Sequence, residues 1–202
     1  LLQARGLAPG EYPERWNLSH PDVVTAIHKA YFDAGSNVVC ANTFGANPLK
    51  FAPDELEAIV AAAIANAGAA RAASAAGEKF VALDIGPTGR LLRPLGPLDF
   101  EDAVAAFAGT VRLGAKYGAD LVFIETMNDS YETKAALLAA RENCDLPVVV
   151  SNAYGADGKL MTGATPSAMV ALLEGMGVTA LGANCSLGPA ELRGVNQSHI
   201  YN

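Results

Sequence analysis

The stretch DLVFIETM, residues 120–127, begins as a continuous apolar run and ends in glutamate, threonine and methionine. Apolar residues that follow one another without alternation are typical of strands buried on both faces, as in parallel sheets. Four further stretches share this character, and they are residues 37–44, 79–87, 146–154 and 178–186. The sequence therefore predicts five buried, parallel strands that end in polar or small residues.

Helical patterns separate the predicted strands. They cover residues 21–33, 54–76, 99–117, 130–143 and 166–176. Asp129 and Thr165 are placed as N-caps, and Glu132 follows Asp129 at the spacing of a capping box. Glycines stand where helices should end, at Gly77, Gly118 and Gly177. Helices that alternate with strands predict a parallel sheet with right-handed crossover connections.

Two architectures satisfy this order of elements, an open doubly wound sheet and a (β/α)8 TIM barrel. The absence of a GxGxxG or Walker-type loop weakens the nucleotide-binding version of the first. A barrel needs eight strands and about 250 residues. We therefore expect an incomplete TIM-type α/β barrel that lacks one strand before residue 1 and two after residue 202. An open five-stranded sheet, complete in itself, is the alternative.

On the barrel interpretation, residues 1–202 form one partial domain with an atypical tail at 193–202. Composition excludes several partners: a net charge of −7 and no basic cluster argue against nucleic acid. No apolar run approaches the roughly 20 residues that span a bilayer. The three cysteines, Cys40, Cys144 and Cys185, cannot all pair, which indicates a reducing, cytoplasmic compartment.

Polar side chains at the predicted strand ends are the candidates for chemistry, because ligands of parallel α/β folds sit at the carboxyl ends of strands. These residues are Asn42, Thr43, Asp84, Glu125, Thr126, Asn152, Asn184 and Cys185. Structural roles compete: Asp84 precedes a turn and could bond backbone N–H groups, and Asn42 and Asn152 could organise loops. Glu125 directly follows an apolar run, where a carboxylate is costly unless it is paired.

The cysteines and histidines are also weighed between structural and functional roles. Cys185, taken alone, is more typical of a small buried hydrophobe than of a metal ligand. Cys40 on an apolar strand and Cys144 near a helix end are expected to be structural. His20 and His28 lie before and within the first helix, away from the strand ends, and receive no role.

Four motifs in order carry a resemblance: NTFGAN (42–47), DIGPTG (84–89), IETM (124–127) and GANCSLGP (182–189). Together they resemble the homocysteine-binding domain of homocysteine S-methyltransferases, and most of all the N-terminal module of cobalamin-dependent methionine synthases. The resemblance implies a zinc-dependent barrel that binds homocysteine. It implies that Cys185 is a zinc thiolate with Asn184 beside it, and that Glu125 holds the substrate amino group. Asn42 and Asp84 open matching motifs and are expected in the substrate site.

The chain also departs from the family pattern. The family's other two zinc ligands come from a Gly-Gly-Cys-Cys motif, and its first-strand Asp-Gly segment helps hold the amino acid; neither is present. Cys40-Ala41 stands where the family often has Glu-Thr. We therefore expect an incomplete zinc site and no turnover by this chain alone. A makeshift site between Cys185 and Cys40 is the alternative.

The resemblance also implies the reaction. A free thiol has a pKa of about 8.5, and zinc coordination deprotonates it, which makes homocysteine a nucleophile. The methyl group would come from methylcobalamin, charged by methyltetrahydrofolate on other domains of the parent protein, and the product would be methionine. Betaine or S-methylmethionine is the alternative donor. A third possibility is a non-catalytic α/β domain that self-associates through open sheet edges.

Overall fold

The computed structural model describes residues 1–200, without the side chains of residues 194 and 196–200. Its strands are β1 (Val38–Cys40), β2 (Phe80–Ile85), β3 (Leu121–Met127), β4 (Val148–Asn152) and β5 (Ala180–Ala183). They form one parallel sheet in the order β1-β2-β3-β4-β5. Each strand lies beside its predecessor, as in a barrel, and the order never reverses as it does in doubly wound sheets. The prediction of five parallel strands is confirmed.

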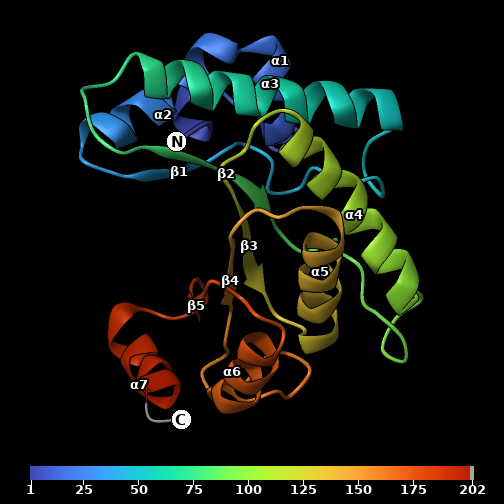
Figure 1. Ribbon diagram of the computed structural model, residues 1–202. Helices are drawn as coiled ribbons and strands as arrows, with labels where there is room; N and C mark the ends of the chain where they lie inside the picture. The colour runs from blue at the N-terminus through green and yellow to red at the C-terminus, as the bar shows by residue number, and fades with distance from the viewer. Residues whose placement is uncertain (201–202) are drawn as a thin grey trace.

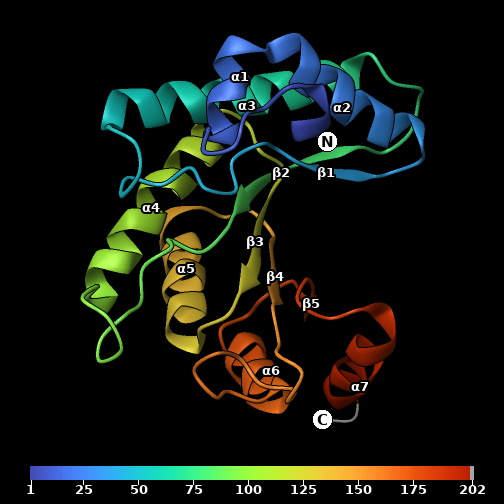
Figure 2. The ribbon, with the colours of Figure 1, turned by 180° about the vertical axis from the view of Figure 1, so that it is seen from behind.

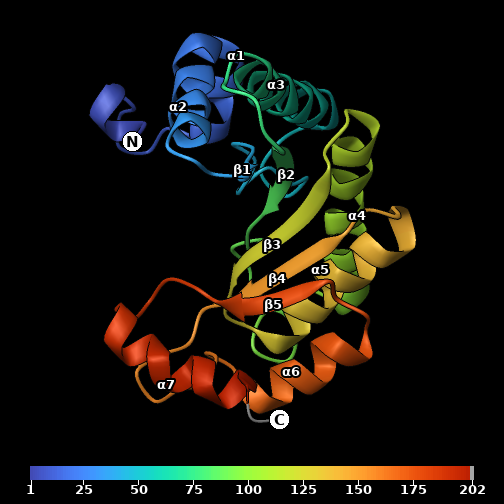
Figure 3. The same ribbon diagram turned by 60° about the vertical axis from the view of Figure 1, so that its left-hand side comes forward.

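Helices connect the strands. The long ones are α2 (Pro21–Asp33), α3 (Pro53–Ala72), α4 (Phe100–Lys116), α5 (Ser130–Asn143), α6 (Pro166–Gly175) and α7 (Pro189–Ile200). Short turns at the start are η1 (Gln3–Arg5), η2 (Pro13–Arg15) and α1 (Trp16–Ser19). The sheet fans out from β1 beside α2 and α3 to β5 beside α6 and α7 (Figures 1 and 2). Figure 3 shows α4 and α5 together on one side of β3 and β4.

The core lies between the sheet and these helices. Its largest fully buried side chains include Ile59, Leu83, Phe107, Ile124 and Leu137, which come from three helices and two strands. Alanines are buried on α3, α4 and α5, where small side chains let helix and sheet backbones approach closely. Within the described residues, no helix combines the length and apolar character needed to span a membrane.

Most predicted helix ends are confirmed. Asp129 accepts a hydrogen bond from the Tyr131 N–H, and Thr165 accepts one from the Ala168 N–H. Gly118 and Gly177 follow the C-cap residues with φ of +89° and +74°. These two positions therefore have the left-handed backbone that favours glycine.

Other predicted boundaries are wrong. The long helix ends at Ala72 with Ala73 as its C-cap, so Gly77 lies in the loop beyond. Glu132 does not complete a capping box, because its carboxylate accepts hydrogen bonds from Thr88 instead. The strands are shorter than predicted: β1, for example, ends at Cys40 rather than at residue 44, whereas β3 ends at Met127 as predicted. Residues 193–200 of the expected tail lie in α7, and residues 201–202 lie outside the described residues.

Candidate functional site

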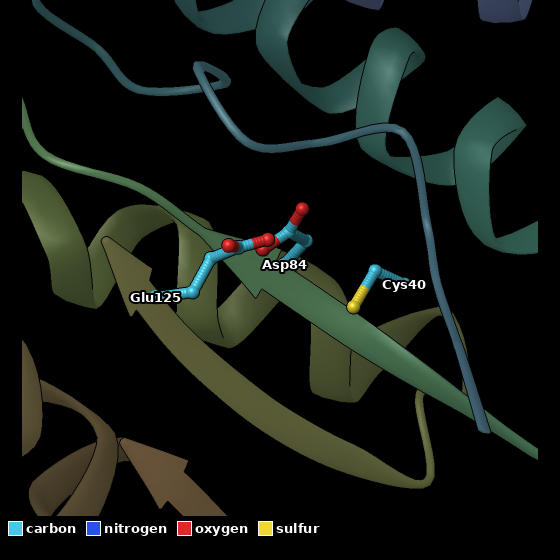
Figure 4. A group of neighbouring side chains, drawn as sticks. All are labelled: Cys40, Asp84 and Glu125. Atoms are coloured by element: carbon cyan, nitrogen blue, oxygen red, sulfur yellow. The ribbon is translucent and has the colours of Figure 1, made fainter. Parts of the chain in front are cut away.

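Three side chains meet where β1, β2 and β3 end: Cys40, Asp84 and Glu125 (Figure 4). The strand register explains the meeting. Cys40 pairs with Ala82, two residues before Asp84, and Asp84 pairs with Phe123, two residues before Glu125. Residues two apart on a strand point to the same face, so the three side chains share one face of the sheet. One ligand atom from each lies within 4.8 Å of the other two.

Negative charge on the three side chains of this cluster is unfavourable in the absence of a cation. Asp84 is only 6% exposed, and burial, followed by the charge of Glu125, raises its pKa well above the ordinary value. Burial also raises the pKa of the Cys40 thiol, with smaller contributions from both carboxylates. No lysine or arginine among the described residues forms an ion pair with Asp84 or Glu125. The cluster therefore stabilises a proton or another cation placed within it.

On its other side, Glu125 is tied to the end of β5. Its Oε2 accepts hydrogen bonds from Asn184 Nδ2 at 2.9 Å and from Thr126 Oγ1 at 3.0 Å. Asn184 Nδ2 also lies 3.5 Å from Cys185 Sγ, and its Oδ1 accepts from Ser151 Oγ at 2.8 Å. Asn184 thereby joins the ends of β3, β4 and β5, and it places the Cys185 thiol next to the carboxylate.

Cys185 is exposed, so the interpretation of it as a buried hydrophobe is wrong. Its φ is +57°, and Ser186 and Thr126 have φ of +57° and +58°. Such left-handed backbone costs roughly 1–3 kcal/mol at a residue other than glycine, and it collects at functional sites. Three strained residues around one thiol and one carboxylate mark this corner of the sheet as a site rather than a simple loop.

The asparagines at the other strand ends hold loops together. Asn42 Nδ2 donates to the Pro13 carbonyl at 2.7 Å, and Asn152 Nδ2 donates to the Met127 carbonyl at 3.2 Å. Asn42 nevertheless lines a cavity of about 680 Å³ together with Cys40 and Asp84. Asp84 was alternatively expected to bond backbone N–H groups of the following turn. The structure does not show this, because its buried Oδ1 has no hydrogen-bond partner among the described residues.

Sequence reasoning missed His28, which lies in α2 as predicted but lines the same cavity as Cys40 and Asp84. Burial lowers the pKa of His28 to about 4, so the imidazole is neutral at pH 7, and its buried Nε2 has no hydrogen-bond partner in the part of the chain that the structure describes. The apolar positions Val24 and Ile27 also line the cavity, so helical spacing from these residues was the signal that could have found it.

One group of potential metal ligands stands out among the described residues. Of all sets of three or more His, Cys, Asp or Glu there, only Cys40, Asp84 and Glu125 have ligand atoms within 4.8 Å of one another. Cys185 is not a member of that set. Cys144 lies at the end of α5, as expected, where its thiol donates to the Ala140 carbonyl.

Two solved structures have folds similar to that of this chain. The metallated form of the homocysteine methyltransferase MmuM from Escherichia coli superposes with a TM-score of 0.84 at 23% identity, covering 97% of this chain and 74% of that one. The carboxyl transferase domain of Rhizobium etli pyruvate carboxylase reaches 0.53 at 16% identity, over 88% of this chain and 31% of that one. The predicted fold class, an α/β fold of the (β/α)8 TIM-barrel type with five parallel strands, is confirmed.

Sequence comparison identifies relatives of this chain and its family. Methionine synthases from Mycobacterium leprae and Mycobacterium tuberculosis are 30% and 29% identical to this chain in alignments of length 187 that cover 87% of this chain. The chain spans only 15% and 16% of the length of these relatives. The profile of the homocysteine S-methyltransferase family matches residues 2–199. This chain therefore belongs to the homocysteine S-methyltransferase family.

Proposed function

We propose that residues 1–202 are a partial homocysteine-binding barrel domain that presents the sulfur of homocysteine for methylation to methionine. One observation carries the proposal: Asn184 holds the Glu125 carboxylate at 2.9 Å and lies 3.5 Å from the Cys185 thiol. A carboxylate and a thiol fixed side by side suit a substrate with an ammonium group at one end and sulfur at the other. Membership of the family supports this substrate class.

In this proposal Glu125 pairs with the substrate ammonium, and the neighbouring buried carboxyl group of Asp84 offers its unpartnered Oδ1 as a second hydrogen-bond acceptor. A charge-assisted hydrogen bond of this kind contributes about 1.5–3 kcal/mol. Asn42, on the wall of the same cavity, has both amide hydrogens directed at Pro13 and Asn17, so its side-chain oxygen is what it can offer a ligand.

Zinc, which the family resemblance implies, does not find a complete site at Cys185. A catalytic zinc needs three protein ligands and one open position. The described side chains that share a hydrogen bond with the Cys185 sulfur belong to Thr126 and Asn184, a hydroxyl and an amide. We therefore propose Cys185 as one zinc thiolate whose partners do not come from its described neighbours, and we expect no turnover by this chain alone.

We further propose methylcobalamin, charged by methyltetrahydrofolate, as the methyl source on other domains of a longer protein. The similarity to methionine synthases, of which this chain spans a small part, supports that choice. Betaine or S-methylmethionine is the alternative donor. A cytoplasmic location suits the three free cysteines, Cys40, Cys144 and Cys185.

Calorimetry with two ligands tests the proposed substrate. We expect L-homocysteine to bind, and 4-mercaptobutanoate, which keeps the thiol and carboxylate but lacks the amino group, to bind at least about ten times more weakly, because Glu125 then has no ammonium partner. A metal chelator in both titrations isolates the contribution of the protein side chains. Equal affinity for the two ligands, or no binding of homocysteine, would contradict the proposal.

The sheet edges favour a second, non-exclusive role, self-association. β1 pairs only with β2, and β5 pairs only with β4, so each has one side without a strand partner among the described residues. Val38 on β1 and Phe80 on β2 are also more than 40% exposed. Unpaired edges are templates for pairing with another copy. Sedimentation equilibrium is expected to give a mass that rises with concentration above the 20.8 kDa monomer, and a constant monomer mass would argue against this role.

A further inference from the structure

We propose that Cys40, Asp84 and Glu125 together bind one divalent transition-metal ion, of the type of Zn²⁺ or Co²⁺, at a position separate from Cys185. This site goes beyond the homocysteine-binding role and does not depend on it. The ligands come from the ends of three consecutive strands, β1, β2 and β3 (Figure 4). Rigid strands, rather than loops, therefore hold all three donors.

The spacing of the donors fits a single ion. With metal–sulfur and metal–oxygen bonds of about 2.3 and 2.0 Å, ligand atoms around a tetrahedral ion lie roughly 3.3–3.5 Å apart. The three ligand atoms lie within 4.8 Å of one another, so small side-chain rotations close the difference. The strand register already places the three residues on one face of the sheet.

An independent observation points to a ligand at this place. Asp84 is 94% buried, given its 6% exposure, and its buried Oδ1 has no hydrogen-bond partner among the described residues. A buried carboxylate without a donor is rare and costly, and a second carboxylate beside it adds repulsion. Figure 4 shows the carboxylates of Asp84 and Glu125 beside each other, with the Cys40 sulfur on the same side of the sheet. A divalent cation among them satisfies all three groups at once.

The donor types select the kind of metal. One thiolate with two carboxylates suits borderline ions such as Zn²⁺ and Co²⁺, whereas Mg²⁺ and Ca²⁺ take oxygen ligands. The neutral imidazole of His28 lines the adjoining cavity, which also gives an ion a route to the site. Asn184 and Thr126 donate hydrogen bonds to Oε2 of Glu125, so we assign the other carboxylate oxygen, Oε1, to the metal. Because the proposed substrate ammonium uses the same carboxylate, metal and ammonium would compete for it.

Titration of the chain with Co²⁺ alone tests the site, since a thiolate bound to Co²⁺ gives a charge-transfer absorption band in the near ultraviolet. A phosphine reductant keeps the cysteines reduced without adding a thiol. We expect one Co²⁺ per chain with this band in the wild-type protein and in Cys185→Ser and Cys144→Ser. We expect Cys40→Ser to lose the band and to bind at least about ten times more weakly, and Asp84→Asn to keep the band with weaker binding.

Several outcomes would overturn the proposal: no Co²⁺ binding by the wild-type chain, wild-type affinity in Asp84→Asn, or a band lost in Cys185→Ser and kept in Cys40→Ser. Circular dichroism of each variant checks that it is folded, and the conservative Asp84→Asn exchange provides a second reading independent of the Cys40 variant. Cys40→Ser leaves Glu125 in place, so it should still distinguish homocysteine from 4-mercaptobutanoate. Failure of metal binding is thus separable from failure of the proposed function.

Discussion

Replacing Glu125 with glutamine is expected to weaken homocysteine binding by about ten- to a hundred-fold. The exchange removes the negative charge that would pair with the substrate ammonium, and it leaves a side chain of the same shape. Glutamine keeps a carbonyl oxygen that can accept from Asn184 Nδ2 and Thr126 Oγ1, so the bonds that connect β3 to β5 can persist. The loss should therefore appear in binding and not in folding.

Calorimetry in the presence of a metal chelator measures this loss. Glu142→Gln is the matched control, because Glu142 is an exposed residue near the end of α5 and forms no described contact with the site. We expect the control to bind homocysteine like the wild-type chain and both variants to unfold at similar temperatures. Wild-type affinity in Glu125→Gln would remove Glu125 from the proposed substrate site.

The strand pattern made much of this site predictable. Continuous apolar runs identify the parallel strands, and their polar ends must lie along one edge of the sheet. Asp84, Glu125, Asn184 and Cys185 were all predicted on that ground, and the structure places all four at strand ends. The pairing of Asp84 with Phe123 could not be read from the sequence, because register is a property of two strands together. The closeness of Asp84 to Glu125 follows from that register.

Local patterns failed where a distant partner competed with a near one. Glu132 has the spacing of a capping box, yet it bonds Thr88, which lies 44 residues away. No sequence pattern near Glu132 indicates Thr88 as its partner. The hydrogen-bonded pair follows from the packing of α5 against the loop after β2. Cys40 was expected to be structural for a similar reason. The apolar sequence around Cys40 indicates only a buried strand, and its proximity to Asp84 and Glu125 depends on how the neighbouring strands pair with it.

Replacing Glu132 with alanine is expected to lower the free energy of unfolding by about 2–4 kcal/mol. Glu132 is buried, and its Oε1 accepts both the Thr88 N–H at 2.8 Å and the Thr88 hydroxyl at 2.6 Å. Alanine would leave two buried donors without an acceptor and a space where the side chain had been. Glu132→Gln is the matched control, because its amide oxygen can still accept from Thr88, and it should lose much less stability in urea unfolding.

The pH dependence of stability, compared between the wild-type chain and Glu132→Gln, separates the effect of the Glu132 charge from that of its hydrogen bonds. Burial is the main cause that raises the pKa of Glu132 above its ordinary value of 4.5, so the folded chain holds this proton more tightly than the unfolded chain. Its contribution to stability is complete below about pH 4.5 and is lost as the pH rises through the raised pKa. Relative to Glu132→Gln, the wild-type chain should therefore lose stability across that interval. Parallel stability curves for the two proteins would show that Glu132 keeps its ordinary pKa and that its bonds to Thr88 offset the cost of burial.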